Sequence, residues 1–320
     1  MSSKTSNGSA KKTYSYLGPI GTFTELALAQ VAEAKGANWH PVSHVQEAID
    51  DVIAGRAFRA IIPVENSVEG GVSATSDALA VNPNIRIYGE YLVPVTFDLV
   101  ARPGTALADV KVVATHPVAY AQTRTWLAKN LKKHTHLPAT STAAAAAELL
   151  NTDAFGLNVD AAVAAPTITK HYKLKVLAKN IGDNKNAQTR FLQIGLANST
   201  PKATGKDKTS VIVELPTDRP GALLEMLEQF AARGVNLSRI ESRPIGDRLG
   251  RYRFNIDVQG HIDDDAVAEA LKGLHRFSPK VTYLGSYARA DKEKSVHEGN
   301  NSNPEFASAD AWLKKLKSAR

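Results

Sequence analysis

Strand-type and helix-type segments alternate along the chain up to residue 196, and this alternation restricts the possible folds more than any other feature. Apolar runs with strand character lie at 13–17, 60–64, 84–95, 110–114 and 191–195. Helical apolar spacing lies between several of them, at 26–31, 45–54 and 119–132. Such alternation predicts an α/β fold with mainly parallel strands and helices on both faces of the sheets.

The order of these segments also predicts two lobes. The chain leaves its first half near Pro94 and returns before residue 190. We therefore expect one domain over 13–196, with a lobe formed by 13–94 plus 185–196, a second lobe formed by 95–184, and a cleft between them.

Within the second lobe, three hydroxyl residues at 140–142 precede an alanine-rich helix predicted at 143–150. A further alanine-rich segment, 161–165, is also predicted to be helical. Residues 155–159 either form a strand or lead into that helix.

A polar linker at 197–207 separates this domain from a segment with a different pattern. A strand at 209–215 precedes a helix that opens at Pro220-Gly221, and an extended segment at 236–242 follows. A cleanly alternating strand at 251–258, a helix from 263 to 275 and a strand at 281–287 complete the set. The order βαββαβ over 208–287 predicts an α+β ferredoxin-like domain. This domain contains no plausible nucleophile–base pair, so we expect a binding module.

Both ends of the chain are polar. Residues 1–12 are rich in Ser and Lys and are expected to be disordered. Residues 288–320 form a polar tail in which Trp312, Leu313 and Leu316 have helical spacing, so a surface helix over 309–317 is predicted. These two ends carry five of the seven net positive charges. The region between them has no basic stripe with interleaved aromatic residues, so we expect no nucleic-acid partner.

The composition excludes several other classes. The chain has no cysteine, which excludes disulfides and thiolate chemistry. No predicted helix carries two histidines at the spacing of a metal site, and His134 and His136 are expected at the surface, so no metal is predicted. There is neither a signal-peptide pattern nor a run of 18 apolar residues, so we expect a cytoplasmic protein without a membrane partner.

Two segments carry candidate site chemistry. The apolar strand at 60–64 ends abruptly in Glu65-Asn66-Ser67 and a double glycine. Polar residues at the end of a buried strand face the ligand crevice in α/β proteins, although a simple strand end would give the same pattern. At 18–25, a glycine turn precedes a helix opened by Thr22 or Thr24. A helix start of this kind can bind an anion, although most are ordinary capped helices.

Taken together, four segments occur in the order seen in the prephenate dehydratase family, which the chain resembles. They are Gly18-Pro19-x-Gly21-Thr22-Phe23-Thr24-Glu25, Pro63 to Gly70, Thr115-His116-Pro117 with Gln122, and Thr189-Arg190-Phe191. Ile20 and Thr123 depart from the residues common in the family, but both lie beside the matched positions.

The region 208–287 resembles the ACT regulatory domain that follows the dehydratase domain in this family. It carries Gly221-Ala222-Leu223 and Glu241-Ser242-Arg243-Pro244. No helical mutase segment precedes residue 13, so the pattern resembles the stand-alone bacterial enzyme more than the fusion with chorismate mutase.

The resemblance implies a lyase of phenylalanine biosynthesis that converts prephenate to phenylpyruvate with loss of CO₂ and water. It implies feedback by L-phenylalanine and a homodimer or homotetramer paired partly through the ACT domains. Aromatisation drives the reaction, so no cofactor is expected. Two alternatives stay open: an arogenate dehydratase, whose substrate has an amine in place of the ketone, and a non-catalytic amino-acid sensor.

The resemblance also assigns roles to residues. Thr189 is the expected catalytic group, donating a hydrogen bond or proton to the leaving hydroxyl. Arg190 either pairs with a substrate carboxylate or forms a structural ion pair, and Phe191 is expected to pack under the site. The expected substrate-binding residues are Thr22, Glu65, Asn66, Ser67, Thr115, His116, Gln122, Arg190 and Phe191. The expected phenylalanine-binding residues are Gly221, Ala222, Leu223, Asn236, Leu237, Glu241, Ser242 and Arg243.

Overall fold

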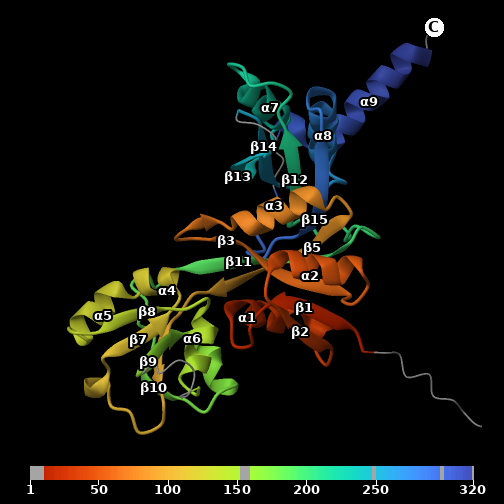
Figure 1. The fold of residues 1–320 in the computed structure, drawn as a ribbon. Helices are drawn as coiled ribbons and strands as arrows, with labels where there is room; N and C mark the ends of the chain where they lie inside the picture. Colours follow the sequence, from red (N-terminus) through yellow and green to blue (C-terminus); the bar gives the residue numbers. More distant parts are fainter. Residues whose placement is uncertain (1–10, 152–158, 247–249, 296–298, 319–320) are drawn as a thin grey trace, which may run out of the picture. The chain divides into compact units, whose positions relative to one another are not determined.

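In the computed structural model, which describes residues 11–151, 159–246, 250–295 and 299–318, a six-stranded sheet organises the amino-terminal lobe (Figure 1). Its strands have the order β2-β1-β3-β11-β5, and β4 pairs with β3. Their bounds are β1 Thr13–Leu17, β2 Asn38–Val42, β3 Arg59–Asn66, β4 Gly70–Gly71, β5 Ile85–Pro94 and β11 Gln188–Leu196. The strands predicted at 13–17, 60–64, 84–95 and 191–195 are therefore confirmed.

Helices α1 (Phe23–Gln30) and α2 (Val45–Ile53) pack on this sheet. A buried carboxylate ties α2 to β1, because Ser15 Oγ donates to Asp51 Oδ2 at 2.6 Å. Arg56 Nε donates to the other oxygen at 2.7 Å. Burial raises the pKa of the Asp51 carboxyl, but the hydrogen bonds from Ser15 and Arg56 outweigh burial, and its pKa lies below the ordinary value.

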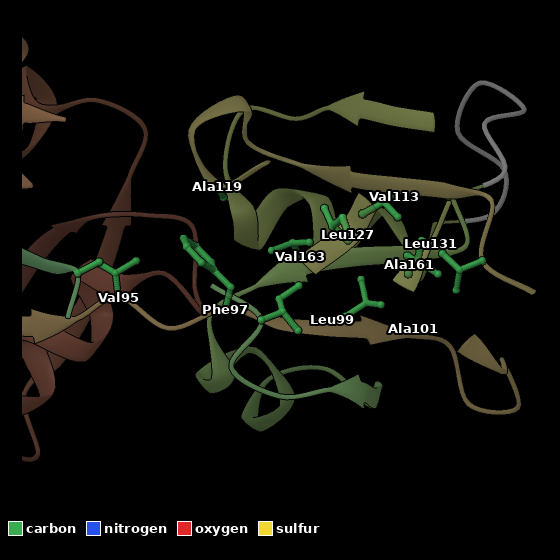
Figure 2. Close-up of a cluster of buried hydrophobic side chains, with 13 residues drawn as sticks. Val95, Phe97, Leu99, Ala101, Val113, Ala119, Leu127, Leu131, Ala161 and Val163 are labelled. Carbon is green, nitrogen blue, oxygen red and sulfur yellow. The ribbon is translucent and has the colours of Figure 1, made fainter. Parts of the chain in front are cut away.

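A five-stranded sheet of order β10-β6-β9-β7-β8 forms the core of the second lobe. The strands are β6 Asp98–Ala101, β7 Val112–Thr115, β8 Thr135–Pro138, β9 Ala161–Ala164 and β10 Lys175–Ala178. The helices are α4 Pro117–Ala121, α5 Arg124–Asn130 and α6 Thr142–Glu148. Figure 2 shows Leu99, Val113 and Val163 of this sheet directed into one apolar cluster with Leu127 of α5.

The helix predicted at 161–165 is wrong, because Ala161–Ala164 form the buried strand β9 between β6 and β7. Alanine favours helices in isolation, but a central strand covered on both faces accepts small apolar side chains equally well. Of the open alternatives at 155–159, residues 155–158 lie outside the described part.

Both sheets of the dehydratase region are mixed. The pairs β1–β2, β1–β3, β7–β8 and β7–β9 are parallel, whereas β3–β4, β6–β9 and β6–β10 are antiparallel. Parallel pairs join strands linked by helical crossovers, and antiparallel pairs occur where the chain returns directly or re-enters the lobe.

The carboxy-terminal sheet is four-stranded, with the order β13-β14-β12-β15 and antiparallel pairing throughout. The elements run β12 Asp207–Glu214, α7 Ala222–Ala231, β13 Leu237–Pro244, β14 Tyr252–Gln259, α8 Asp265–Phe277 and β15 Val281–Ala288. This order confirms the predicted βαββαβ arrangement. Both helices pack on one face of the sheet, where Val211, Met226, Ile256 and Leu274 are buried together. A last helix, α9 (Asn303–Ser318), confirms and lengthens the helix predicted near the end.

The described residues form two compact units. The first contains 11–72 and 91–191, and the second contains 73–90 and 192–318. Helix α3 (Ser73–Val81) and most of β5 therefore belong to the same compact unit as the carboxy-terminal sheet, although β5 pairs with β11 of the six-stranded sheet. Within this unit Ile87 of β5 lies against Gly285 of β15, where an added Cβ atom would be 2.6 Å from the Ile87 carbonyl oxygen. No described helix is long and apolar enough to cross a membrane.

Candidate active site

A cavity of about 270 Å³ lies within the first unit, between groups from its two sheets. Residues of the β1–α1 turn, β3 and β11 line one side of the cavity, and residues of α4 and of the segment before α6 line the other side. Its polar lining residues are Thr22, Thr24, Asn66, His116, Gln122, Thr140, Ser141, Thr142 and Thr189. Among the described lining residues there is no acid, lysine or arginine.

Asn66 and Thr189 meet in this cavity from the ends of two strands of one sheet. Asn66 Nδ2 donates to Thr189 Oγ1 at 2.8 Å. The side-chain amide oxygen of Asn66, Oδ1, accepts from the backbone N–H groups of Val68 at 2.8 Å and Glu69 at 3.3 Å. These two acceptor bonds fix the orientation of the amide, because only its oxygen can accept. Thr189 is therefore a hydrogen-bond acceptor from Asn66, and its own proton stays available for another partner.

Strand alternation decides which predicted residues reach the cavity. Thr189 and Phe191 line it, whereas Arg190 between them does not. Arg190 is buried, and its Nη1 lies 3.6 Å from Glu65 Oε2. Glu65 is in turn the neighbour of Asn66 on β3 and is also absent from the lining.

Ser67 likewise lies outside the lining and holds the two strands together. Its backbone N–H donates to the Gln188 carbonyl oxygen at 2.9 Å, and its Oγ accepts from the Gln188 N–H at 2.9 Å. Ser67 thereby keeps Asn66 beside Thr189.

Thr22 is the residue that precedes α1, and it lines the cavity. Its hydroxyl donates to the Leu17 carbonyl oxygen at 3.2 Å rather than capping the helix. The Gly21 N–H donates to Glu25 Oε2 at 2.5 Å, and Glu25 Oε1 lies 2.7 Å from His171 Nε2. Glu25 therefore fixes the turn that carries Thr22.

On the opposite wall, His116 and Gln122 lie at the start and end of α4 and line the cavity. His116 Nδ1 accepts from the Val118 N–H at 3.3 Å, so the neutral ring carries its proton on Nε2. Thr115 does not reach the cavity, because it is fully buried and its hydroxyl donates to the Val163 carbonyl oxygen at 2.9 Å.

Sequence reasoning missed the hydroxyl residues at 140–142 as part of the site. Thr140, Ser141 and Thr142 line the cavity together, and Ser141 Oγ also accepts from the Ala144 N–H at 2.9 Å. The signal was present as three consecutive hydroxyl residues, but capping alone was enough to explain them. Among the described residues, no group of three or more His, Asp or Glu side chains could hold a metal ion.

The residues expected to bind phenylalanine lie on the second unit. Gly221 precedes α7 with a φ of 85°, a left-handed conformation that favours glycine. Ala222 is buried, whereas Leu223 is exposed. Asn236 is exposed and its carbonyl oxygen accepts from the Gln259 N–H, and Leu237 begins β13 and packs on the core.

Glu241, Ser242 and Arg243 follow one another on β13, so Ser242 points to the opposite face from its two charged neighbours. Ser242 is exposed, and the two charged side chains are partly buried. Both charged side chains are hydrogen-bonded to α3 of the same unit, Glu241 to Ser76 and Arg243 to Asp77.

Comparison with known proteins agrees with this arrangement. The family model described as prephenate dehydratase matches residues 14–199, and the ACT domain model matches residues 209–276. A curated protein from Mycobacterium marinum named prephenate dehydratase is 42% identical over 313 residues, covering 95% of this chain and 96% of its own. Its counterpart from Mycobacterium ulcerans is 44% identical over 280 residues, covering 85% and 87%.

Among solved structures, a prephenate dehydratase from Arthrobacter aurescens in complex with L-Phe is 52% identical. It superposes with a TM-score of 0.91 and covers 96% of this chain and 99% of its own. The chain therefore belongs to the prephenate dehydratase family and carries an ACT domain after its dehydratase domain.

Proposed function

We propose that this chain is a lyase that converts prephenate to phenylpyruvate, CO₂ and water. The bond between the ring and its carboxylate breaks, and its electron pair enters the ring. At the opposite ring position the C–O bond breaks and its electron pair leaves with the oxygen. The departing hydroxide then takes up one proton to become water. Aromatisation of the ring supplies the driving force, so the protein's task is to orient the substrate and stabilise the departing oxygen.

One observation carries this proposal: the 2.8 Å hydrogen bond from Asn66 Nδ2 to Thr189 Oγ1 inside the cavity. With Asn66 acting as the donor, the Thr189 hydroxyl directs its own proton toward the cavity. A free threonine is a poor acid. Thr189 therefore acts as a fixed hydrogen-bond donor to the departing hydroxyl, and the proton comes finally from a stronger acid or from water.

The remaining polar groups suit a dianion with a ketone. The hydroxyls at 140–142 can donate to a substrate carboxylate on one side of the cavity, and Thr22 lines the other side, with its hydroxyl donated to the Leu17 carbonyl oxygen. His116 and Gln122 supply further donors from α4. The Arg190–Glu65 pair and Ser67 support the strands from outside the cavity. Because no acid lines the described cavity, nothing there favours the ammonium group of arogenate, and we assign the keto acid as substrate.

We further propose that L-phenylalanine inhibits the enzyme by binding the residues Gly221–Leu223, Asn236, Leu237 and Glu241–Arg243. The relative from Arthrobacter aurescens was solved in complex with L-Phe, which supports L-phenylalanine as the ligand. We also propose that the protein is a cytoplasmic homodimer or homotetramer paired through its ACT domains. In this proposal the dehydratase domain spans 13–196, the linker spans 197–207 and the ACT domain spans 208–287.

The test is phenylpyruvate formation by the purified chain, with prephenate and arogenate offered in parallel. We expect turnover of prephenate. Thr189→Val keeps the shape but removes the hydroxyl, and should lower kcat about 100- to 1,000-fold. Thr189→Ser keeps the hydroxyl and should retain most of the activity. If the wild type makes no phenylpyruvate, the proposed function is wrong. If Thr189→Val keeps full activity, only the role of Thr189 is wrong.

A further inference from the structure

Asp77 on α3 binds two arginines of the carboxy-terminal sheet within the second unit. Arg243 Nη2 lies 2.7 Å from Asp77 Oδ2, and Arg243 Nε donates to Asp77 Oδ1 at 3.2 Å. Arg253 of β14 donates from Nη2 to Asp77 Oδ1 at 2.6 Å. The Arg243 guanidinium is therefore bound to a carboxylate in a two-pronged geometry, which is the arrangement that recognises carboxylates most strongly.

A second contact joins the same helix to the same strand. Ser76 Oγ donates to Glu241 Oε2 at 3.1 Å, and Arg239 also donates to this carboxylate. Helix α3 is thus attached through Ser76 and Asp77 to both charged residues of the Glu241-Ser242-Arg243 motif. The Asp77 side chain is 44% exposed, so a small ligand can approach this pair from solvent.

We propose that Asp77 occupies Arg243 as an internal competitor for the carboxylate of the amino-acid effector, so that effector binding releases α3 from β13. The proposal rests on the phenylalanine regulation proposed above, and adds the residue that transmits it. The carboxylate of a free amino acid and that of Asp77 present the same two oxygens to a guanidinium. Arg243 cannot bind both in the same geometry, so the two interactions oppose each other.

The chain directly before α3 connects this helix to Asn66, which is hydrogen-bonded to Thr189. Helix α3 begins immediately after Val72, and β4 before it pairs with Glu65 and Asn66 of β3. The turn between β3 and β4 supplies the Val68 and Glu69 N–H groups that fix the Asn66 amide. Loosening this segment turns Asn66 away from Thr189, so the effector inhibits by disordering the hydrogen bond that orients the catalytic hydroxyl.

The experiment compares wild type with Asp77→Asn by calorimetric titration with L-phenylalanine and by prephenate turnover with and without it. Removing the competing charge should tighten L-phenylalanine binding about 5- to 10-fold, at the lower end of the range typical of coupling between sites. The variant already resembles the released state, so added L-phenylalanine should inhibit it less at saturation. A residue with only a structural role would weaken effector binding, so unchanged or weaker binding would overturn the proposal.

Glu269→Gln is the matched control, because Glu269 of α8 forms an ion pair with Lys272 in the same unit, away from the motif. Its L-phenylalanine affinity should stay within about twofold of wild type, and an equal tightening would overturn the specific role of Asp77. If Asp77→Asn does not fold, hydrogen exchange on the wild type decides. Amides at 73–81 should exchange faster when L-phenylalanine is added, and unchanged or slower exchange would contradict the release of α3. Failure of the proposed function itself would show separately, as absent turnover or absent effector binding in the wild type.

Discussion

Exchanging Asn66 for Asp tests the direction of the central hydrogen bond with almost no change of shape. In the wild type, Asn66 Nδ2 donates to Thr189 Oγ1 at 2.8 Å, and the amide oxygen accepts from Val68 and Glu69. The carboxylate introduced by Asn66→Asp keeps both acceptor bonds but cannot donate. The Thr189 hydroxyl then turns its proton toward position 66 and no longer donates into the cavity.

The size of the effect follows from what is lost. Loss of one oriented donor to a developing negative oxygen costs about 2.7–4 kcal/mol, or about 100- to 1,000-fold in kcat. The charge introduced at 66 also repels the two substrate carboxylates, so KM should rise as well. The fold should hold, because a charged acceptor replaces a neutral one at the same two N–H groups, and the midpoint of thermal unfolding should change little.

Steady-state phenylpyruvate formation measures both parameters. Asn186→Asp adds the same charge on the exposed segment before β11 and should leave kcat close to wild type. Thr189→Val added to Asn66→Asp should lower kcat little further, because both changes remove the same donor. A kcat for Asn66→Asp within threefold of wild type would refute the assigned direction of the bond.

Three further predictions concern stability, each read from the midpoint of thermal unfolding. Asp51→Asn should destabilise the protein at neutral pH. The pKa of the Asp51 carboxyl is lower in the folded state than in the unfolded state. The ionised carboxylate therefore stabilises the fold fully above its unfolded pKa, and this stabilisation is lost as the pH falls through the folded pKa. The deficit of Asp51→Asn should therefore shrink on acidification, and a constant deficit would contradict this account. Glu90→Gln removes the carboxylate 2.9 Å from buried Lys208 Nζ and should cost about 3 kcal/mol, whereas a midpoint equal to wild type would exclude a stabilising pair. Gly285→Ala combines a φ of 138° with a Cβ atom 2.6 Å from the Ile87 carbonyl oxygen, so it should lower the midpoint clearly, and an unchanged midpoint would show that β15 and β5 separate easily.

The fold was predictable wherever local patterns and packing agree. The strand at 251–258 alternates polar and apolar residues because only one of its faces meets α7 and α8, and that periodicity survives in the sequence. The segment at 161–164 shows the opposite case. Its Ala-Ala-Val-Ala run has no alternation and a helical composition, and only its place between β6 and β7 makes it a strand.

The site was predictable as a set of segments but not residue by residue. Asn66, Thr189, His116 and Gln122 line one cavity although they come from distant parts of the chain. Arg190 is directly beside Thr189 in the sequence but does not line the cavity. A motif read from sequence includes neighbours of both kinds, because strand periodicity assigns alternate residues to opposite faces without stating which face is the cavity.

The sequence by itself determined the βαββαβ module, the family and the order of most other elements, because these depend on local spacing and on motifs in a fixed order. The tertiary structure alone decided which groups face each other. It joined the hydroxyls at 140–142 to Asn66 and Thr189 in one cavity, and it placed α3 with the carboxy-terminal sheet through Asp77 and Arg243. Such pairings depend on how separate elements pack, and no local pattern in either partner records the position of the other.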